Sequence, residues 1–232
     1  MSGRFVIRED LLRSANPGLR LSKFMDQENP EWGQLAGTRL DDGAYRQAYQ
    51  RWERHWSSEG DRRIVLKGRV TGRLAMGLGN ESVLEVGIRL NHTYGTPVIP
   101  GSAVKGVLRG RIADAGVRDF LFGGPGNAAF LAFQDAWWVP EGRSPFTADV
   151  MTVHHPDYYS RSDDTAPTDF DNPNPVQFLS VRGSFLFVVE FLGDDSNSPW
   201  KAYVEKLLRG TAEKDGIGGK RSAGYGRFQF GV

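Results

Sequence analysis

The sequence predicts an α+β protein in which an antiparallel sheet carries helices, with an N-terminal helical extension and one long polar insertion. Two observations lead to this prediction. Apolar residues alternate with polar ones in several short segments, as in half-buried strands, and recur every three or four residues in others, as in amphipathic helices. At 232 residues, the chain is long enough to bury a sizeable core as one elaborated domain.

Residues 1–60 are polar and turn-rich, and we interpret them as an extension that precedes a domain of residues 61–232. Within the extension, Tyr45, Tyr49, Trp52 and Trp56 recur at spacings of four, three and four. This spacing places the four rings on one face of a helix. We expect that face to pack on the protein's own core, and docking against a neighbouring subunit is the alternative.

The domain opens with a strand signal at residues 62–74, where Ile64, Leu66, Val70 and Leu74 occupy alternate positions. A turn at Pro100–Ser102 then precedes a helical stripe that ends near Gly116, with Ser102 as the expected N-cap. Further signals complete the domain: a strand within 128–139, further strand signal over 176–181 and 184–192 together, a helix at 200–208, and a terminal strand in which Tyr225, Phe228 and Phe230 are the apolar residues.

Between about residues 140 and 175 the composition shifts to Asp, Pro, Asn, Ser and Thr, which indicates an insertion outside the core. Without this insertion and the extension, the order is strand, helix, strand, strand, helix, strand. That order is typical of the ferredoxin-like or RRM-like fold, a four-stranded antiparallel sheet with two helices on one face. Because this fold supports many functions, it does not decide the function here.

Composition narrows the functional classes. The formal net charge is +1, so a polyanionic partner requires a local basic patch. The absence of cysteine excludes disulfides, thiolate zinc sites and cysteine nucleophiles. No stretch approaches the roughly 20 apolar residues of a membrane span, and residues 1–10 lack the apolar core of a secretory signal, so we expect a cytoplasmic protein with no membrane partner.

The most informative motif is GIGGKRSAGYGR, residues 216–227, with five glycines and three cations in twelve residues. Glycines let the backbone approach a ligand closely, so that successive N–H groups can face phosphate oxygens while the cations neutralise charge. Lys214 and Arg221 break the P-loop pattern, and Arg221 also replaces the third glycine of a dinucleotide fingerprint. The motif therefore favours a sugar-phosphate backbone, and a purely structural glycine turn is the alternative.

A second candidate anion site lies at the start of the helix near residue 102. Lys105 and Arg109 are four residues apart and therefore share one helix face, next to the free N–H groups of the helix N-terminus. An ordinary solvated face is the alternative interpretation.

These two segments resemble the RAMP superfamily of CRISPR RNA-binding proteins, which a glycine-rich loop near the C-terminus defines. Other segments resemble the sixth-subunit class of the type III-B, or Cmr, complex, and the likeness runs from about residue 16 to residue 228. The segments are NPGLRLSKF, GLGNESVLEVGIRLNHTYGTPVIPGS, FQDAW, DVMTVHHPDYY and PTDFDNPNPVQFLSV.

The resemblance implies a non-catalytic subunit that grips guide RNA, or guide and target RNA, by the backbone and packs against other RAMP subunits. The RNA-binding residues that it implies are Gly101, Ser102, Lys105, Arg109, Gly216, Gly218, Gly219, Lys220, Arg221, Gly224, Tyr225, Gly226 and Arg227. In related subunits an insertion projects as a thumb. Residues 140–175 are the counterpart here, and the expected contact residues are Met151, His154, Tyr158 and Tyr159.

Catalysis is not expected. Where related nuclease subunits carry an aspartate, the comparable stretch offers Glu85. An endoribonuclease using His92, Tyr94 and His154 for proton transfer is one alternative function. A protein-interaction module that docks through Trp52 and Trp56 is the other.

We expect neither a metal nor a cofactor. The adjacent His154 and His155 would face opposite ways in a strand, and Pro173 replaces the third ligand of an EF-hand in the acidic stretch around residue 170. For Asp135 we expect a hydrogen bond at the sheet edge.

Overall fold

The structure, a computed structural model, describes residues 16–21, 32–38, 40, 43–57, 62–79, 86–153, 174–193 and 199–231. Glu85, His154, His155, Tyr158, Tyr159 and the acidic stretch around residue 170 lie outside the described residues. Among the helices of the described ranges, none has the length and apolarity needed to cross a membrane.

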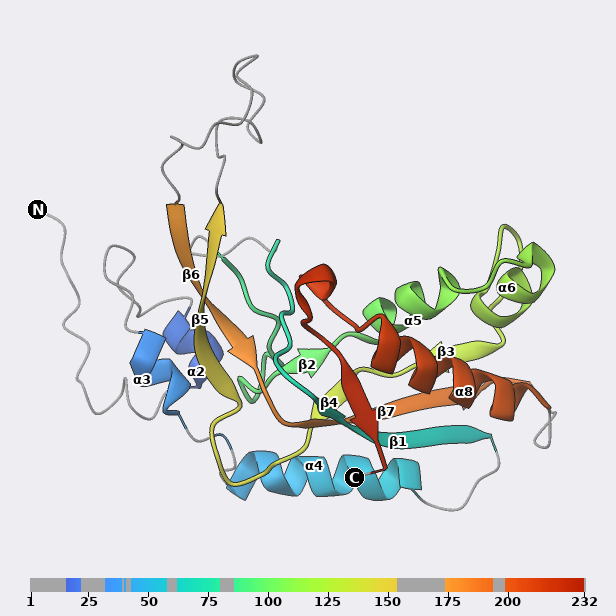
Figure 1. The fold of residues 1–232 in the computed structure, drawn as a ribbon. Helices are drawn as coiled ribbons and strands as arrows, with labels where there is room; N and C mark the ends of the chain where they lie inside the picture. Colours follow the sequence, from blue (N-terminus) through green and yellow to red (C-terminus); the bar gives the residue numbers. More distant parts are fainter. Residues whose placement is uncertain are drawn as a thin grey trace, which may run out of the picture.

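The centre of the fold is an antiparallel sheet in the order β2-β4-β7-β1-β8, with β3 also paired to β7 (Figure 1). Its strands are β1 (Arg63–Val70), β2 (Val98–Ile99), β3 (Leu131–Phe133), β4 (Ala136–Trp138), β7 (Ser184–Phe191) and β8 (Phe228–Phe230). The prediction of helices combined with an antiparallel sheet is confirmed. The sheet has six strands instead of the four expected, because β2 adds a strand and the 128–139 segment forms two.

Strand β7 is the central strand because residues 185–189 are buried, with side chains on both faces of the sheet. It pairs with β1 from Arg63↔Glu190 to Arg69↔Ser184, and on its other edge with β3 and β4. The break between β3 and β4 falls at residues 134–135. There, Asp135 accepts a hydrogen bond from the Gly101 backbone at 2.8 Å, which is the role expected for this residue at the sheet edge.

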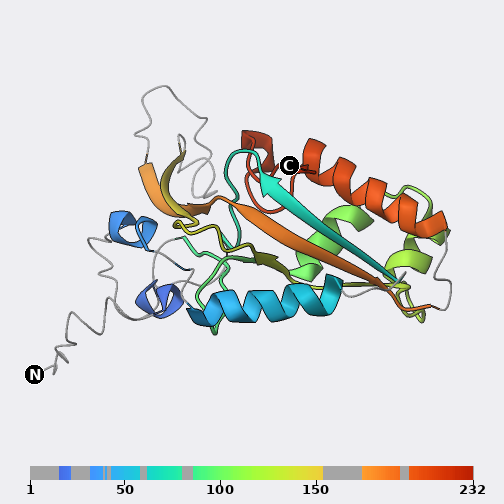
Figure 2. The same cartoon turned by 90° about the horizontal axis from the view of Figure 1, so that it is seen from below.

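Helices cover both faces of the sheet (Figures 1 and 2). Helix α4 (Gly43–Ser57) lies on one face, and α5 (Gly101–Arg109) and α8 (Pro199–Lys214) lie on the other, with α6 (Ala115–Phe122) beyond the end of α5. The short helices α2 (Pro17–Leu19) and α3 (Trp32–Ala36) lie near the root of a projecting hairpin.

The aromatic face of α4 packs on the sheet of its own chain. Tyr45 and Trp56 are buried, the Trp52 ring stacks on Trp137 with 4.9 Å between centroids, and the Tyr45 hydroxyl donates a hydrogen bond to the Trp138 carbonyl. The expectation that this stripe packs on the core is confirmed. Trp56 is buried and Trp52 is half-buried against Trp137, so most of this face is used inside the chain instead of being left for a partner.

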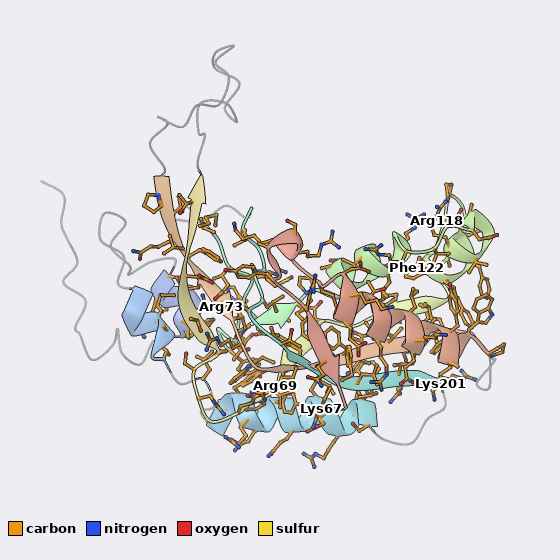
Figure 3. The ribbon with its side chains drawn as sticks, in the orientation of Figure 1. Lys67, Arg69, Arg73, Arg118, Phe122 and Lys201 are labelled. Atoms are coloured by element: carbon orange, nitrogen blue, oxygen red, sulfur yellow. The ribbon has the colours of Figure 1, made fainter. Side chains whose placement is uncertain are left out.

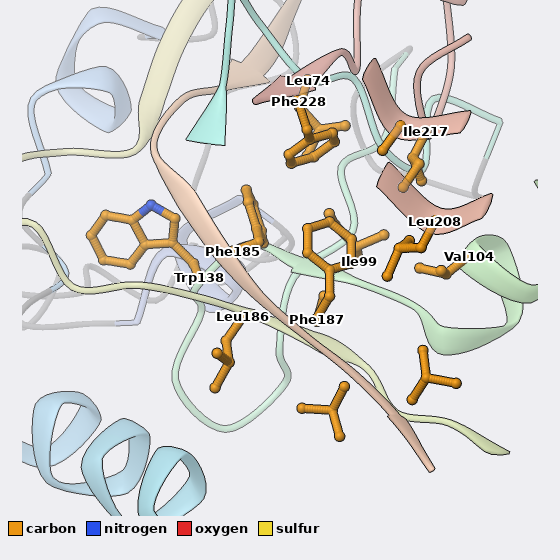
Figure 4. Packing of buried hydrophobic residues seen from close by; sticks show 14 of the residues in the cluster. Leu74, Ile99, Val104, Trp138, Phe185, Leu186, Phe187, Leu208, Ile217 and Phe228 are labelled. Atoms are coloured by element: carbon orange, nitrogen blue, oxygen red, sulfur yellow. The ribbon is translucent and has the colours of Figure 1, made fainter. Parts of the chain in front are cut away.

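On the opposite face, β7 and β8 contribute aromatic rings in edge-to-face contact beneath α5 and α8 (Figure 4). Phe187 meets Phe228 edge-to-face at 5.2 Å, and Leu208 and Ile217 complete this part of the core with almost no exposed surface. Burying each such side chain contributes about 1.5–3 kcal/mol. Ile217 belongs to the glycine motif, so one end of that motif is built into the core.

The helix expected to begin at Ser102 and end near residue 116 is two helices. Helix α5 begins at Gly101 and ends before Gly110, and its N-cap residue is Pro100 instead of the expected Ser102. Helix α6 begins after Asp114, whose side chain accepts the Val117 N–H at 2.8 Å. This cap explains the break, since an acidic side chain at the N-cap satisfies the first free amides of a new helix.

The predicted insertion begins with a strand that the sequence did not reveal, and this strand forms a hairpin with the strand expected at residues 176–181. Strands β5 (Phe146–Val153) and β6 (Asn174–Val181) pair antiparallel along their full length and project from the body of the protein (Figure 1). The chain passes from β6 into β7 through Gly183, whose φ is 108°. A Cβ atom there would lie 2.5 Å from Trp138 Nε1, so only glycine fits this corner.

Candidate nucleic-acid interface

The glycine motif forms a loop between α8 and β8 that closes on itself and on residues 73–75. Gly216 N donates to Thr211 O at 3.0 Å and Ile217 N to Gly226 O at 2.8 Å. Gly219 N donates to Ala75 O at 2.8 Å. These amides are used inside the fold, which differs from the expectation that successive amides of the whole motif face a ligand.

Several glycines of the loop are required by close backbone packing. Gly226 has φ +73°, and a Cβ there would lie 1.9 Å from Ile217 O. Gly218 has φ +99°, and its Cβ would lie 2.6 Å from Ala75 O. For these positions, the alternative of a structural glycine turn accounts for the residue type.

The tip of the loop is different, because it is open and basic. Residues 220–224 form one short 3-10 turn, η2 (Arg221–Ala223), between Lys220 at φ 52° and Gly224 at φ 86°. Across the described part of the chain, no hydrogen-bond acceptor is found for the backbone N–H groups of Lys220, Arg221 and Ser222. Within the described part of the motif, the successive amides left without an acceptor are therefore those of about three residues at the tip.

Four cations of the predicted site have no acidic partner among the described residues, so none has to be displaced when an anion binds. Within the described ranges, Lys105, Lys220, Arg221 and Arg227 form no ion pair, and Arg221 and Arg227 are exposed. Arg109 differs, because its guanidinium pairs with Asp119 at 3.1 Å.

The start of α5 is mostly satisfied by its own surroundings. The Gly101 amide is bound to Asp135, and a Cβ at Gly101 would lie 2.1 Å from Phe133 O. The amides of residues 103 and 104 donate to Pro100 O. Exposed Ser102 and half-buried Lys105 remain available. Next to them, residues 106, 109, 110, 112 and 118 line an open depression of about 570 Å³.

The hairpin turns one face toward the glycine loop. Asp149 and Phe178 lie opposite each other in the β5–β6 register, and so do Met151 and Val176, one step further out. Residues two apart on a strand share a face, so all four side chains belong to one face of the hairpin. Lys220 Nζ lies 6.0 Å from the Phe178 ring centroid, which identifies this face as the one beside the loop tip.

A three-residue network joins the hairpin and the loop. Arg73 Nη1 lies 2.5 Å from Asp149 Oδ2, and the Tyr225 hydroxyl donates to the same oxygen at 2.6 Å. Figure 3 shows Arg73 at the base of the hairpin. Burial alone would raise the pKa of Asp149, but the bonds from Arg73 and Tyr225 outweigh it and hold that pKa below its ordinary value.

Sequence reasoning missed Arg73, Asp149 and Phe178 as parts of this surface. No spacing rule could identify Asp149, which lies 76 residues from Tyr225 in the chain. Tyr225 was expected in the terminal strand, but it precedes β8 and turns toward the hairpin.

Of the residues considered for proton transfer, His92 and Tyr94 are described by the structure and His154 is not. His92 is exposed, and the Tyr94 ring packs 5.5 Å from Tyr45. No group of three His, Asp or Glu side chains among the described residues is arranged to hold a metal ion.

Comparison with known proteins identifies the class. The model of the RAMP superfamily matches residues 68–229, and the chain belongs to this superfamily. It is similar to the CRISPR system Cmr subunit Cmr6 of Pyrococcus furiosus, at 27% identity over 71% of this chain and 67% of that protein. The Cmr6 subunit of Saccharolobus solfataricus is 26% identical over 64% of this chain, which spans 50% of that relative. The resemblance to the sixth-subunit class is thus confirmed.

The fold is also found in a solved structure. One chain of the cryo-EM structure of the Type III-B Cmr-beta bound to cognate target RNA superimposes with a TM-score of 0.65, at 20% identity. The match covers 84% of this chain and 67% of that chain.

Proposed function

We propose that this protein is a non-catalytic, RNA-binding structural subunit of a type III-B CRISPR effector complex. It grips the backbone of guide RNA, or of guide and target RNA, and packs against other RAMP subunits in the cytoplasm. The observation that carries the proposal is the open tip of the glycine loop, which holds free amides and the cations Lys220 and Arg221. Lys220 lies beside the inner face of the hairpin, the face that carries Asp149, Met151, Val176 and Phe178. The similarity to Cmr6 subunits supports the assembly.

We further propose that β4, β7, β1 and β8, with α5 and α8, form a ferredoxin-like unit within residues 61–232. The sheet order supports this assignment if β3 and β4 are taken as one interrupted strand. Residues 1–60 then form an extension whose helix α4 covers the second face of the sheet.

The site residues divide into two proposed roles. The residues proposed to contact phosphate are Ser102, Lys105, Lys220, Arg221, Gly224 and Arg227. The residues proposed to shape the loop and the start of α5 are Gly101, Arg109, Gly216, Gly218, Gly219, Tyr225 and Gly226. Met151, His154, Tyr158 and Tyr159 are the proposed contacts from the hairpin, acting as a thumb. Binding of this kind uses charge and hydrogen bonds alone, so it needs neither a metal nor a cofactor.

A pair of matched double variants tests RNA binding in the reconstituted complex. Lys220→Ala/Arg221→Ala removes two cations at the loop tip, and Arg51→Ala/Arg54→Ala removes two from the exposed side of α4, on the opposite face of the sheet. Guide-RNA affinity is measured at several salt concentrations. The first variant is expected to weaken binding and to reduce the salt slope by about 1.4, at roughly 0.7 per lost phosphate contact. Equal slopes for the two variants would contradict the proposal.

Incubation of the purified protein with CRISPR repeat RNA separates binding from cleavage. Intact RNA is the expected result. One defined cut, lost in the His92→Ala variant, would instead support the endoribonuclease alternative.

A further inference from the structure

We propose that Asp149 is a positioning residue that fastens the β5–β6 hairpin to the glycine loop, so that the hairpin's inner face and the loop tip meet RNA as one rigid surface. This inference rests on the RNA-binding function proposed above. It assigns Asp149, Arg73 and Tyr225 to holding the surface together instead of to contacting RNA.

The root of the hairpin is held by backbone hydrogen bonds through residues 73–75. Leu74 and Val181 exchange two hydrogen bonds of 2.8 Å, which fix the inner end of β6. From the other side, Gly226 N donates to Arg73 O at 2.7 Å and Gly219 N to Ala75 O at 2.8 Å. Residues 73–75 therefore lie between the hairpin root and the glycine loop and are bonded to both.

Asp149 extends this connection outward along the hairpin. It lies three residues beyond Phe146, the partner of Val181 at the root, which corresponds to about 10 Å along a strand. Opposite Asp149, the Phe178 ring lies 6.1 Å from the Tyr225 ring and 6.0 Å from Lys220 Nζ. A two-stranded hairpin is only marginally stable by itself, so contacts this far from its root determine how rigidly it is held.

The chemistry of Asp149 suits a residue that holds the hairpin against the glycine loop and does not suit a residue that contacts RNA. An ionised carboxylate only accepts hydrogen bonds and repels phosphate, so beside a basic loop tip it would oppose RNA if it were unpaired. Here both Arg73 and Tyr225 bind one of its oxygens, and only 13% of its side chain is exposed. Helix α3 contacts both strands of the hairpin as well, so Asp149 supplies one of at least two supports.

Distance measurements test the connection directly, because the chain has no cysteine and labels can be introduced cleanly. Spin labels at Thr152→Cys, near the outer end of β5, and Glu213→Cys, on α8, occupy exposed positions of the full chain. We expect a narrow distance distribution, and Asp149→Asn should broaden or shift it. Glu205→Gln, which breaks the Arg209–Glu205 pair of 2.8 Å on α8, is the matched control and should leave the distribution narrow. An unchanged distribution in Asp149→Asn overturns the inference.

Should Asp149→Asn fail to fold, Tyr225→Phe removes only the hydroxyl group and keeps the Phe178 contact. It is expected to broaden the same distribution to a smaller degree, and no change in a folded Tyr225→Phe variant also overturns the inference. Where both single variants fold, the Asp149→Asn/Tyr225→Phe double variant should match Asp149→Asn alone, because residues in one network do not act additively.

RNA affinity in the reconstituted complex gives the second readout. If Asp149 positions the hairpin, Asp149→Asn weakens guide-RNA binding by roughly tenfold. If Asp149 only masks Arg73, the variant frees a cation and tightens binding, which contradicts the inference but leaves the proposed function intact. If Lys220→Ala/Arg221→Ala leaves guide-RNA affinity unchanged, the proposed function fails. The distance measurement remains valid in that case, because it does not involve RNA.

Discussion

The hydroxyl group of Tyr225 donates a hydrogen bond to Asp149 Oδ2 at 2.6 Å, linking the glycine loop to a strand 76 residues earlier in the chain. Arg73 binds the same oxygen from the segment that follows β1. Three regions that are distant in the sequence thus share one carboxylate. This carboxylate joins the two surfaces that we propose to contact RNA.

The network should lose its contribution to stability in acid. Although burial alone would raise the pKa of Asp149, its bonds to Arg73 and Tyr225 lower it below the unfolded value. A group with a lowered folded pKa stabilises the fold fully above the unfolded pKa, and this contribution is lost as the pH falls through the folded pKa. The free-energy difference between wild type and Asp149→Asn should therefore be constant near neutral pH and shrink below about pH 4. Chemical unfolding at a series of pH values measures it, and a pH-independent difference would contradict this account.

Gly226→Ala should destabilise the fold strongly. The added Cβ would lie 1.9 Å from Ile217 O at a φ of +73°, so both strain and overlap apply. We expect a loss of about 2–4 kcal/mol in urea unfolding. Gly210→Ala on α8 is the control, because nothing lies within 4 Å of its Cβ position, and alanine there should stabilise the helix by about 1 kcal/mol. Equal effects of the two substitutions would show that the loop is not packed as described.

Tyr45→Phe should weaken the attachment of α4 to the sheet. Its buried hydroxyl donates to the Trp138 carbonyl, which would lose this partner, at a cost of about 1–3 kcal/mol. Tyr49→Phe serves as the control, since its hydroxyl makes only a long 3.4 Å contact with Glu53. Thermal unfolding of both variants checks the prediction. A larger loss for Tyr49→Phe would mean that α4 is held differently.

Lys105→Ala and Arg109→Ala should separate binding from folding. Lys105 has no ion pair within the described residues, so its loss should reduce the salt slope of RNA binding by about 0.7 and change the unfolding free energy by less than about 0.5 kcal/mol. Arg109 pairs with Asp119, so Arg109→Ala should also lower stability. Denaturant unfolding alongside RNA titration distinguishes the two residues, and identical behaviour would refute the division of roles.

Most of the sheet and helix pattern could be predicted because it depends on local periodicity. The Tyr45–Trp56 stripe and the alternation in β1 are periodic signals. Tyr45, Tyr49, Trp56, Ile64 and Val70 are buried, as these signals indicate. The break between α5 and α6 was missed, although Asp114 is a good capping residue, because the apolar stripe continues past it.

The hairpin and the closed part of the glycine loop were harder to predict for a different reason. Strand β6 matches the signal expected at residues 176–181, but β5 lies in the stretch that its polar composition assigned to an insertion, and the two strands pair residues far apart in the chain. Glycine enrichment alone cannot separate a ligand cradle from close backbone packing. The neighbours of Gly218 and Gly226 decide it, and these include Ala75, which is remote in sequence.

Photocrosslinking in the assembled complex tests the central claim most directly. Guide RNA with photoreactive nucleotides is crosslinked to the complex, and the attached peptides of this subunit are identified by mass spectrometry. We predict crosslinks to residues 216–227 and to the β5–β6 hairpin. Crosslinks confined to α4, or none to this subunit, would contradict the proposed surface.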